Sequence, residues 1–270
     1  MRDELLSPAE RPQWLARLGD GLRRGMPAQS HPLPLRFRPV VALLTTAVVL
    51  SALWYWGRLP FYRAVIQPTF FPEVEPTLAE LYGYYYLAFS SILTRMIIPL
   101  GIILLVFRDH PRNFGFRLRG TKSLAKIYVV LLAGMLPLMV LASGMASFQA
   151  KYPLYDYAHH SLWHLLVYEV AYVLVFLSGE AFWRGFLIFS LAPVFGLYSL
   201  LIMAIPYAMI HFGKPFPESM GAIAAGVILG AIALKHRSFW FGVALHASIG
   251  VGMDLLCLWR KGELLTLFTG

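Results

Sequence analysis

Charged residues are scarce in this chain. Asp, Glu, Lys and Arg together account for 14% of its 270 residues, whereas a soluble domain carries about 25%. Hydrophobic residues account for 58%, and the mean hydropathy is +0.63. This composition excludes an ordinary soluble globular protein and predicts an integral membrane protein with several spans.

Cysteine and several catalytic motifs are also missing. Cys257 is the one cysteine, which excludes a disulfide framework and a metal site built from cysteines. The sequence has no His-Glu-x-x-His, no Gly-x-Ser-x-Gly and no phosphate-binding loop. Zincin, serine-hydrolase and nucleotide-binding functions are therefore disfavoured.

The basic residues are distributed as in a membrane protein. The formal net charge is +9, but Lys and Arg gather at the ends of apolar runs, which is typical of orientation signals and of contacts with anionic lipid. We therefore expect membrane lipid as a partner and no nucleic acid. With the N-terminus in the cytoplasm, the inner segments carry 15 Lys and Arg residues and the outer segments 6. The positive-inside rule thus predicts an inside N-terminus and an outside C-terminus.

Seven apolar runs are long enough, or nearly so, to cross a bilayer, which takes roughly 20 residues. They are residues 39–57, 82–107, 125–149, 162–190, 195–212, 218–234 and 238–259. We therefore predict an all-α fold, a polytopic transmembrane helical bundle of about seven helices (6–8) with a central polar cavity. Residues 1–38 are expected to form a basic cytoplasmic arm with a short amphipathic helix at 14–22, and residues 260–270 a C-terminal tail.

Four ionisable residues on different runs fall at similar predicted depths. With a helix rise of about 1.5 Å per residue, Glu180 lies roughly 16 Å, His211 roughly 22 Å, His246 roughly 12 Å and Arg95 roughly 18 Å from the inner edge. Ionisable side chains are costly inside a membrane and mark functional sites there. Their similar depth predicts one shared polar cavity.

The residues expected in this cavity can support hydrolysis. Arg184 lies one helical turn from Glu180 and can hold the carboxylate ionised and oriented. A carboxylate beside an imidazole can take a proton from water, and a second imidazole can donate to a developing oxyanion. The alternatives are a structural ion pair and histidines that only bond neighbouring helices. Arg95 is either the counter-charge of Glu180 or the partner of Glu169.

Three motifs around these residues resemble those of the CPBP family of intramembrane proteases, which includes type-2 CAAX prenyl endopeptidases and bacterial abortive-infection proteins. The family's Glu-Glu-x-x-x-Arg reads Gly179-Glu180-Ala-Phe-Trp-Arg184, its Phe-x-x-x-His reads Tyr207-Ala-Met-Ile-His211, and its His-x-x-x-Asn or Asp reads His246-Ala-Ser-Ile-Gly250. The resemblance covers about residues 160–256. It implies a CPBP core at 161–259 that follows N-terminal transmembrane helices at 39–160.

The resemblance implies a membrane-embedded peptide hydrolase of the bacterial inner membrane that acts on membrane-anchored peptides or proteins. The residues that it implies are Glu180, His211, His246 and Arg184 as catalytic, and Arg95, Tyr207 and Asp254 as supporting. A divalent metal such as zinc is possible but not required, and its ligands would be Glu180, His211 and His246.

Two positions depart from the family pattern. The leading glutamate of the first motif, thought to activate water, aligns with Gly179, and the Asn or Asp of the third aligns with Gly250. Asp254, one turn further along, is a potential substitute. Three hypotheses stay open. The first is an endopeptidase in which Glu180 with His211 activates water and His246 helps to stabilise the tetrahedral intermediate. The others are a catalytically impaired membrane protein of the same scaffold acting in immunity or binding, and a small transporter.

Overall fold

The structure is a computed structural model that describes residues 36–118 and 124–268, and every regular element in these ranges is a helix. The all-α prediction is thus confirmed. The predicted arm at 1–38, with its helix at 14–22, lies outside the described residues except for its last three positions. Residues 37–270 form one compact unit, and the fold described here is that of this unit.

The helices follow one another with short connections. In chain order they are α2 (Phe37–Trp56), α3 (Leu59–Phe61), η2 (Tyr62–Ile66), α4 (Gln67–Phe70), α5 (Pro76–Ile92), η3 (Leu93–Ile97), α6 (Ile98–Gly101), η4 (Ile102–Val106), η5 (Pro111–Phe114), α7 (Ala125–Ser143), α8 (Ala146–Gln149), α9 (Leu162–Glu180), η7 (Ala181–Leu187), α10 (Ile188–Phe195), α11 (Tyr198–Met209), α12 (Phe216–His236), α13 (Trp240–Lys261) and η8 (Leu265–Phe268). The labels η2, η3, η4 and η7 denote π-helical turns, whereas η5 and η8 are 3₁₀ turns.

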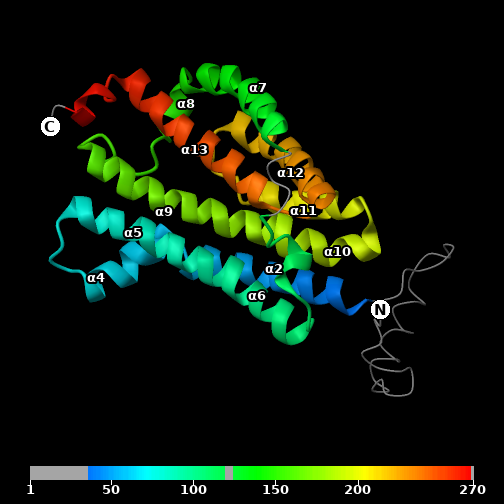
Figure 1. Cartoon of the computed structure of the whole chain (residues 1–270). Coiled ribbons are helices and arrows are strands. Elements are labelled where there is room, and N and C mark those ends of the chain that lie inside the picture. The colour runs from blue at the N-terminus through cyan, green and yellow to red at the C-terminus, as the bar shows by residue number, and fades with distance from the viewer. Residues whose placement is uncertain (1–35, 119–123, 269–270) are drawn as a thin grey trace, which may run out of the picture. The chain divides into compact units, whose positions relative to one another are not determined.

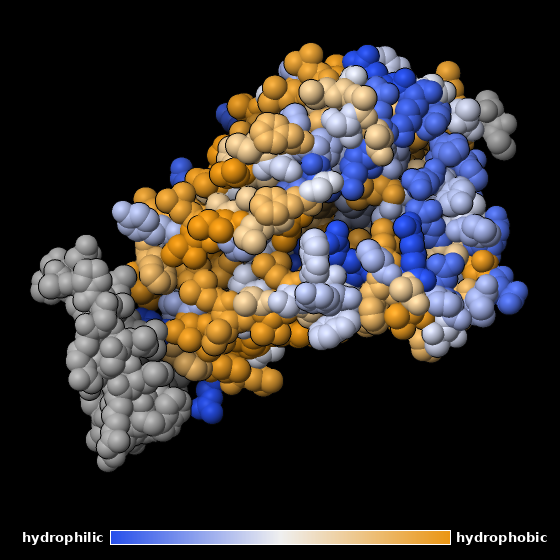
Figure 2. Space-filling view, turned by 180° about the vertical axis from the view of Figure 1, so that it is seen from behind, coloured by the Kyte–Doolittle hydropathy of each residue, from blue (hydrophilic) through white to orange (hydrophobic). Residues whose placement is uncertain are grey.

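Six helical segments of the described chain are long and apolar enough to cross a membrane. They are Phe37–Phe70, Pro76–Val106, Ala125–Ser143, Leu162–Phe195, Phe216–His236 and Trp240–Lys261. The seventh predicted run, 195–212, is the shorter helix α11. Many large apolar side chains remain exposed, for example Leu105 (78%) and Leu141 (71%). Figure 2 shows hydrophobic residues over much of one face of the molecule, with hydrophilic residues gathered toward one end. These features show an integral membrane protein.

The first two spans are longer than predicted. The chain stays helical from Leu59 to Phe70, and α5 begins at Pro76 instead of residue 82. The predicted outer loop at 59–81 is therefore mostly helix. Pro76 suits the first turn of a helix because the N–H that it lacks would have no partner there. The hydroxyl of Tyr62 donates to the Ala79 carbonyl (2.8 Å) and ties the two helical stretches together.

The helix that runs through α9, η7 and α10 lies in the middle of the bundle. In Figure 1 it passes between α5 and α13, and α9 packs against both of them. On the remaining sides, α7 packs on α13 and α11 packs on α12. The central position explains why the span from Leu162 to Phe195 is the most deeply buried of the six. Polar residues on it therefore meet protein rather than lipid.

The connecting segments lie at the two ends of the bundle. At one end, Ser238 Oγ donates to the Arg117 carbonyl (2.8 Å), which joins two segments predicted to face the cytoplasm. At the other end, Lys261 Nζ donates to the Tyr152 carbonyl (2.9 Å), which joins two segments predicted to lie outside. The arrangement agrees with the grouping predicted from Lys and Arg, while the direction of the bundle across the membrane stays a prediction.

Two π-helical turns place the two buried arginines of the bundle's centre. Arg95 lies in η3 and Arg184 lies in η7, and these two turns contact each other. A π turn inserts an extra residue per turn and is frequent at functional sites because it redirects side chains. The centre of the bundle therefore contains irregular helix at the depth where ionisable residues were predicted.

Candidate active site

Glu180 is the last residue of α9, and its side chain is fully buried. Its Oε1 accepts a hydrogen bond from Nη1 of Arg184 (2.8 Å), one turn further along. Its Oε2 is buried without a hydrogen-bond partner among the described residues. Because an ion pair in a dry environment loses little to solvent screening, the contact with Arg184 keeps this carboxylate in place.

Arg184 is held from a second helix. Its guanidinium lies over the ring of Tyr207 on α11, 4.0 Å from the ring centroid. A cation over an aromatic face is attracted by the ring's quadrupole, and more strongly when water is excluded. Tyr207 thus packs on the Glu180–Arg184 pair, and its supporting role in the site stays a prediction.

His246 on α13 completes the contacts of Glu180. Its Nδ1 is 3.1 Å from Oε1 of Glu180, and its side chain is 24% exposed although the carboxylate is not exposed at all. The ring of Phe176 lies against the imidazole at 4.4 Å between centroids. In the neutral tautomer that this bond selects, Nδ1–H donates to the carboxylate and Nε2 keeps a free lone pair.

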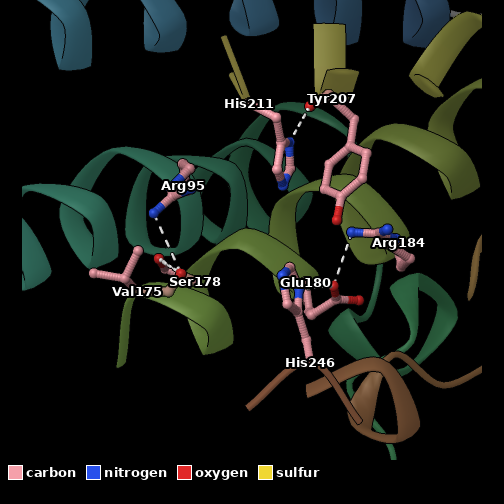
Figure 3. A network of polar contacts seen from close by, with 8 residues as sticks. All are labelled: Arg95, Val175, Ser178, Glu180, Arg184, Tyr207, His211 and His246. Carbon is pink, nitrogen blue, oxygen red and sulfur yellow. Dashed lines mark hydrogen bonds and ion pairs between the residues drawn. The ribbon is translucent and has the colours of Figure 1, made fainter. Parts of the chain in front are cut away.

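His211 approaches from the end of α11. Its Nδ1 is 2.8 Å from the carbonyl oxygen of Tyr207, and its ring packs on that tyrosine at 4.7 Å. The imidazole is close enough to His246 for the charge of one ring to act on the other. In Figure 3, His211 reaches from above, and Glu180 and His246 lie below it, facing the same space. The structure therefore brings together the four residues predicted as catalytic.

Arg95 lies at the edge of this space. It is 8% exposed, and its Nη2 donates to the Val175 carbonyl at 3.3 Å. Neither predicted ion pair, with Glu180 or with Glu169, occurs among the described residues: Arg95 makes no salt bridge there, and both carboxylate oxygens of Glu169 are buried without a hydrogen-bond partner. The pairing failed because Glu180 is already held by Arg184, and Glu169 lies beside Asp254.

Asp254 belongs to a different polar cluster. Its Oδ2 accepts a hydrogen bond from the Tyr168 hydroxyl (3.0 Å), and its carboxyl group neighbours that of Glu169. Among the described residues it bonds neither His246 nor Glu180, so the geometry gives it no direct place at the Glu180 carboxylate. The role of Asp254 as a substitute for the residue missing at position 250 stays a prediction.

Three glycines shape the site. A Cβ on Gly242 would lie 2.2 Å from Oε2 of Glu180, so α13 approaches the carboxylate only because position 242 has no side chain. A Cβ on Gly250 would lie 2.6 Å from the ring of Phe176, which thus fills the space beside position 250. By contrast, a Cβ on Gly179 would find ordinary contacts, the nearest being Arg95 Nη1 at 3.4 Å. Position 179 has room for a side chain, and position 250 does not.

The two histidines have the hydrogen bonds that metal-bound histidines ordinarily make. Such a histidine donates its second ring N–H to a carboxylate or a backbone carbonyl, and the acceptors here are Glu180 and the Tyr207 carbonyl. Within the described ranges, however, no three His, Cys, Asp or Glu side chains lie close enough to hold an ion together. Two of the three predicted ligands, His211 and His246, keep Nε2 free, the atom that would bind a metal. The third, Glu180, instead orients His246 through its carboxylate.

Sequence reasoning missed Phe176, Gly242 and Trp183. A signal existed for the first two: Phe176 precedes Glu180 by one turn, and Gly242 precedes His246 by one turn, so each shares a helix face with a predicted site residue. Trp183 stands inside the first motif, but its direction depends on the π turn, which the sequence pattern does not reveal.

Comparison with known proteins agrees with the core predicted from the motifs. Residues 161–251 match the family described as "Type II CAAX prenyl endopeptidase Rce1-like". The matched range includes Glu180, Arg184, His211 and His246 and excludes Arg95 and Asp254. No curated protein and no solved structure gives a match.

Proposed function

The chain belongs to the CAAX protease-like family through residues 161–251, and on this premise we propose that it is an intramembrane endopeptidase that hydrolyses membrane-anchored peptides or proteins. The observation that carries the proposal is the bond of 3.1 Å between Glu180 Oε1 and His246 Nδ1. It joins a fully buried carboxylate to a partly exposed imidazole, as a base and its orienting group would be joined.

Water activation falls to His246. Because Nδ1–H donates to Glu180, the free Nε2 accepts a proton from water, and the resulting hydroxide attacks the peptide carbonyl carbon. The positive charge that forms on the imidazole is stabilised by the carboxylate at 3.1 Å. Arg184 bonds the same oxygen at 2.8 Å and keeps the carboxylate oriented during this step.

Collapse of the intermediate requires a proton for the leaving amine. His246 returns the proton that it took from water to the amine nitrogen as the C–N bond breaks, so protons balance over the cycle. His211 stands near His246 with its Nδ1 tied to the Tyr207 carbonyl. Because Nδ1–H donates to that carbonyl, the free Nε2 of His211 accepts a hydrogen bond from the hydroxyl group of the tetrahedral intermediate and orients it.

A library of membrane-anchored peptides tests the proposal. The purified full-length protein in lipid vesicles is expected to cleave a subset of the peptides, and mass spectrometry of the products locates the bond. Glu180→Gln and His246→Gln are expected to lower the rate by about 100-fold or more, the scale of a lost general base. Glu169→Gln is the matched control, because it also replaces a buried carboxyl group by an amide, in the cluster around Asp254. Cleavage that persists in both site variants overturns the proposal.

One observation favours a second candidate, a catalytically impaired membrane protein of the same scaffold. Phe176 occupies the space beside Gly250, where the family has a polar residue, and Gly179 replaces the leading glutamate. A wild-type protein that folds, binds peptides and cleaves none of them would support this candidate. Proton-coupled uptake into the same vesicles would instead support a transporter.

A further inference from the structure

Arg95 carries a buried positive charge that no acidic residue of the described chain neutralises. Only 8% of the surface of this residue is exposed. Its one hydrogen bond goes to the Val175 carbonyl, and its Nε is buried without an acceptor. An unpaired guanidinium inside a membrane protein is costly and ordinarily faces an anion or a wet cavity.

A second donor without a partner points at the same place. Trp183 Nε1 is buried and has no acceptor within the part of the chain that the structure describes. The Cβ position of Gly179 lies 3.4 Å from Arg95 Nη1 and 3.9 Å from Trp183 Nε1. Two independent donors from different helices, η3 and η7, therefore converge above a residue that has no side chain.

Position 179 has room for a Cβ atom. A Cβ on Gly179 would meet only ordinary van der Waals contacts, unlike one on Gly242 or Gly250. The next residue in the chain is Glu180, the proposed catalytic carboxylate. Figure 3 shows Arg95 on the side of the site opposite Arg184, with its guanidinium directed toward α9.

We propose that Arg95 and Trp183, above the bare Gly179, bind a carboxylate group of the substrate. This inference rests on the proposed function, because it assigns the ligand to a peptide held at Glu180. A carboxylate would supply the negatively charged partner that Arg95 lacks. Its two oxygens can accept hydrogen bonds from separate donors. A neutral carbonyl would satisfy Trp183 but leave the guanidinium charge uncompensated.

The contacts at position 179 support a carboxylate there. The heavy atom nearest to a Cβ on Gly179 is Arg95 Nη1, at 3.4 Å. In this protein the negative charge is absent from the chain and is supplied by the ligand. The carboxylate has two sources in a peptide, the free C-terminus and an acidic side chain, and the test distinguishes them.

Binding to a Glu180→Gln protein tests the inference without cleavage. The immobilised full chain is offered a library of lipid-anchored peptides, each present as the C-terminal acid and as the C-terminal amide. A second library of amidated peptides contains Glu or Gln at matched internal positions. Peptides with the carboxylate are expected to be retained about tenfold more than their neutral twins in at least one library, the scale of a charge-assisted hydrogen bond. Equal retention in both libraries, including retention of neither form, overturns the inference.

Variants locate the preference. Arg95→Gln is expected to abolish the tenfold difference, because it removes the charge and keeps a polar side chain. Gly179→Glu is expected to abolish it as well, since the chain's own carboxylate then occupies the site, whereas Gly179→Ala, whose Cβ fits, retains the preference. The glycine pair keeps the test decisive if Arg95→Gln does not fold. A preference unchanged by Gly179→Glu contradicts the inference, while a wild type that prefers carboxylates but cleaves nothing contradicts only the proposed function.

Discussion

Gly242 and Glu180 are in direct contact: a Cβ atom on Gly242 would lie 2.2 Å from Oε2 of Glu180. One turn further along α13, His246 bonds the other oxygen of the same carboxylate. A single helix thus covers one oxygen with bare backbone and binds the second with an imidazole. The geometry of the proposed base therefore depends both on the missing side chain at position 242 and on the imidazole of His246.

Gly242→Ala is expected to displace the Glu180 carboxylate. The added methyl group cannot fit at 2.2 Å from Oε2, and overpacking of this kind costs about 1–3 kcal/mol of stability. The bond to His246 is lost with the shift, so peptide cleavage falls as well. Thermal unfolding and the cleavage rate measure the two effects.

Gly221→Ala is the matched control on the neighbouring helix α12. A Cβ there meets nothing within 4 Å, and Ala in a helix is favoured over Gly by up to about 1 kcal/mol. Its stability is therefore expected to be equal or higher, with unchanged cleavage. Equal behaviour of the two variants would show that the contact of Gly242 with Glu180 has no consequence.

Gly250→Asn, which introduces the family's residue, is expected to destabilise the protein. Its Cβ would lie 2.6 Å from the ring of Phe176. Phe176→Ala opens that space, so the double variant is expected to be more stable than the sum of the two single effects predicts. Residues in contact show coupling of about 0.5–3 kcal/mol in such a double-mutant cycle. Strict additivity in chemical denaturation would mean that Phe176 does not block position 250.

Arg184→Met is expected to lower the free energy of unfolding by about 3–5 kcal/mol, because it leaves the buried Glu180 carboxylate without its partner. Glu180→Gln added to Arg184→Met recovers part of this loss, since the uncompensated charge is then gone. Arg63→Met is the control: Arg63 pairs with Glu80 at 3.5 Å with its side chain 56% exposed, and such a pair contributes less than about 1 kcal/mol. A small effect of Arg184→Met would argue that Glu180 is neutral in the folded protein.

The stability of the protein is expected to depend on pH through Asp109, which lies in the connection between the second and third spans. Burial alone would raise the pKa of Asp109, but hydrogen bonds from Asn113, the His110 backbone and Arg38 outweigh burial and hold the pKa below its usual value. A depressed folded pKa adds stability that is present above the unfolded pKa, about 3.9 for Asp, and is lost as the pH falls through the folded value. The stability of the wild type is therefore expected to drop in acid more steeply than that of Asp109→Asn. Parallel curves of unfolding free energy against pH would contradict this assignment.

The sequence predicted the helical class, most of the spans and the convergence of the site. That Glu180, His211 and His246 lie in one region could be predicted because helix rise is regular and buried ionisable residues are rare, while their depths in a membrane stay predictions. The histidine partner of Glu180 was harder to predict. Glu180 was expected to activate water together with His211, but the hydrogen bond of its carboxylate is with His246. Which imidazole lies closer depends on how α11 and α13 pack on α9, and hydrophobic runs do not specify packing.

Other features had no reliable signal in the chain. The gap between the predicted runs 39–57 and 82–107 implied a connection without helix, but η2 and α4 continue the helix there and Tyr62 bonds it to α5. The isolation of Arg95 could not be predicted either, because Glu169, the expected partner, lies beside Asp254. Both outcomes depend on contacts between distant segments rather than on local propensity.

The central claim is that Glu180 and His246 act as one unit, and the cleavage rate of a single peptide tests it most directly. The measurement compares Glu180→Gln, His246→Gln and the double variant, with Glu169→Gln as the control for replacing a buried carboxyl group by an amide. Each single variant is expected to lower the rate by about 100-fold or more, and the double variant no further than the worse single one, because residues that act as a unit are strongly non-additive. Two single effects that multiply in the double variant, or single variants that cleave as fast as the wild type, would contradict the account.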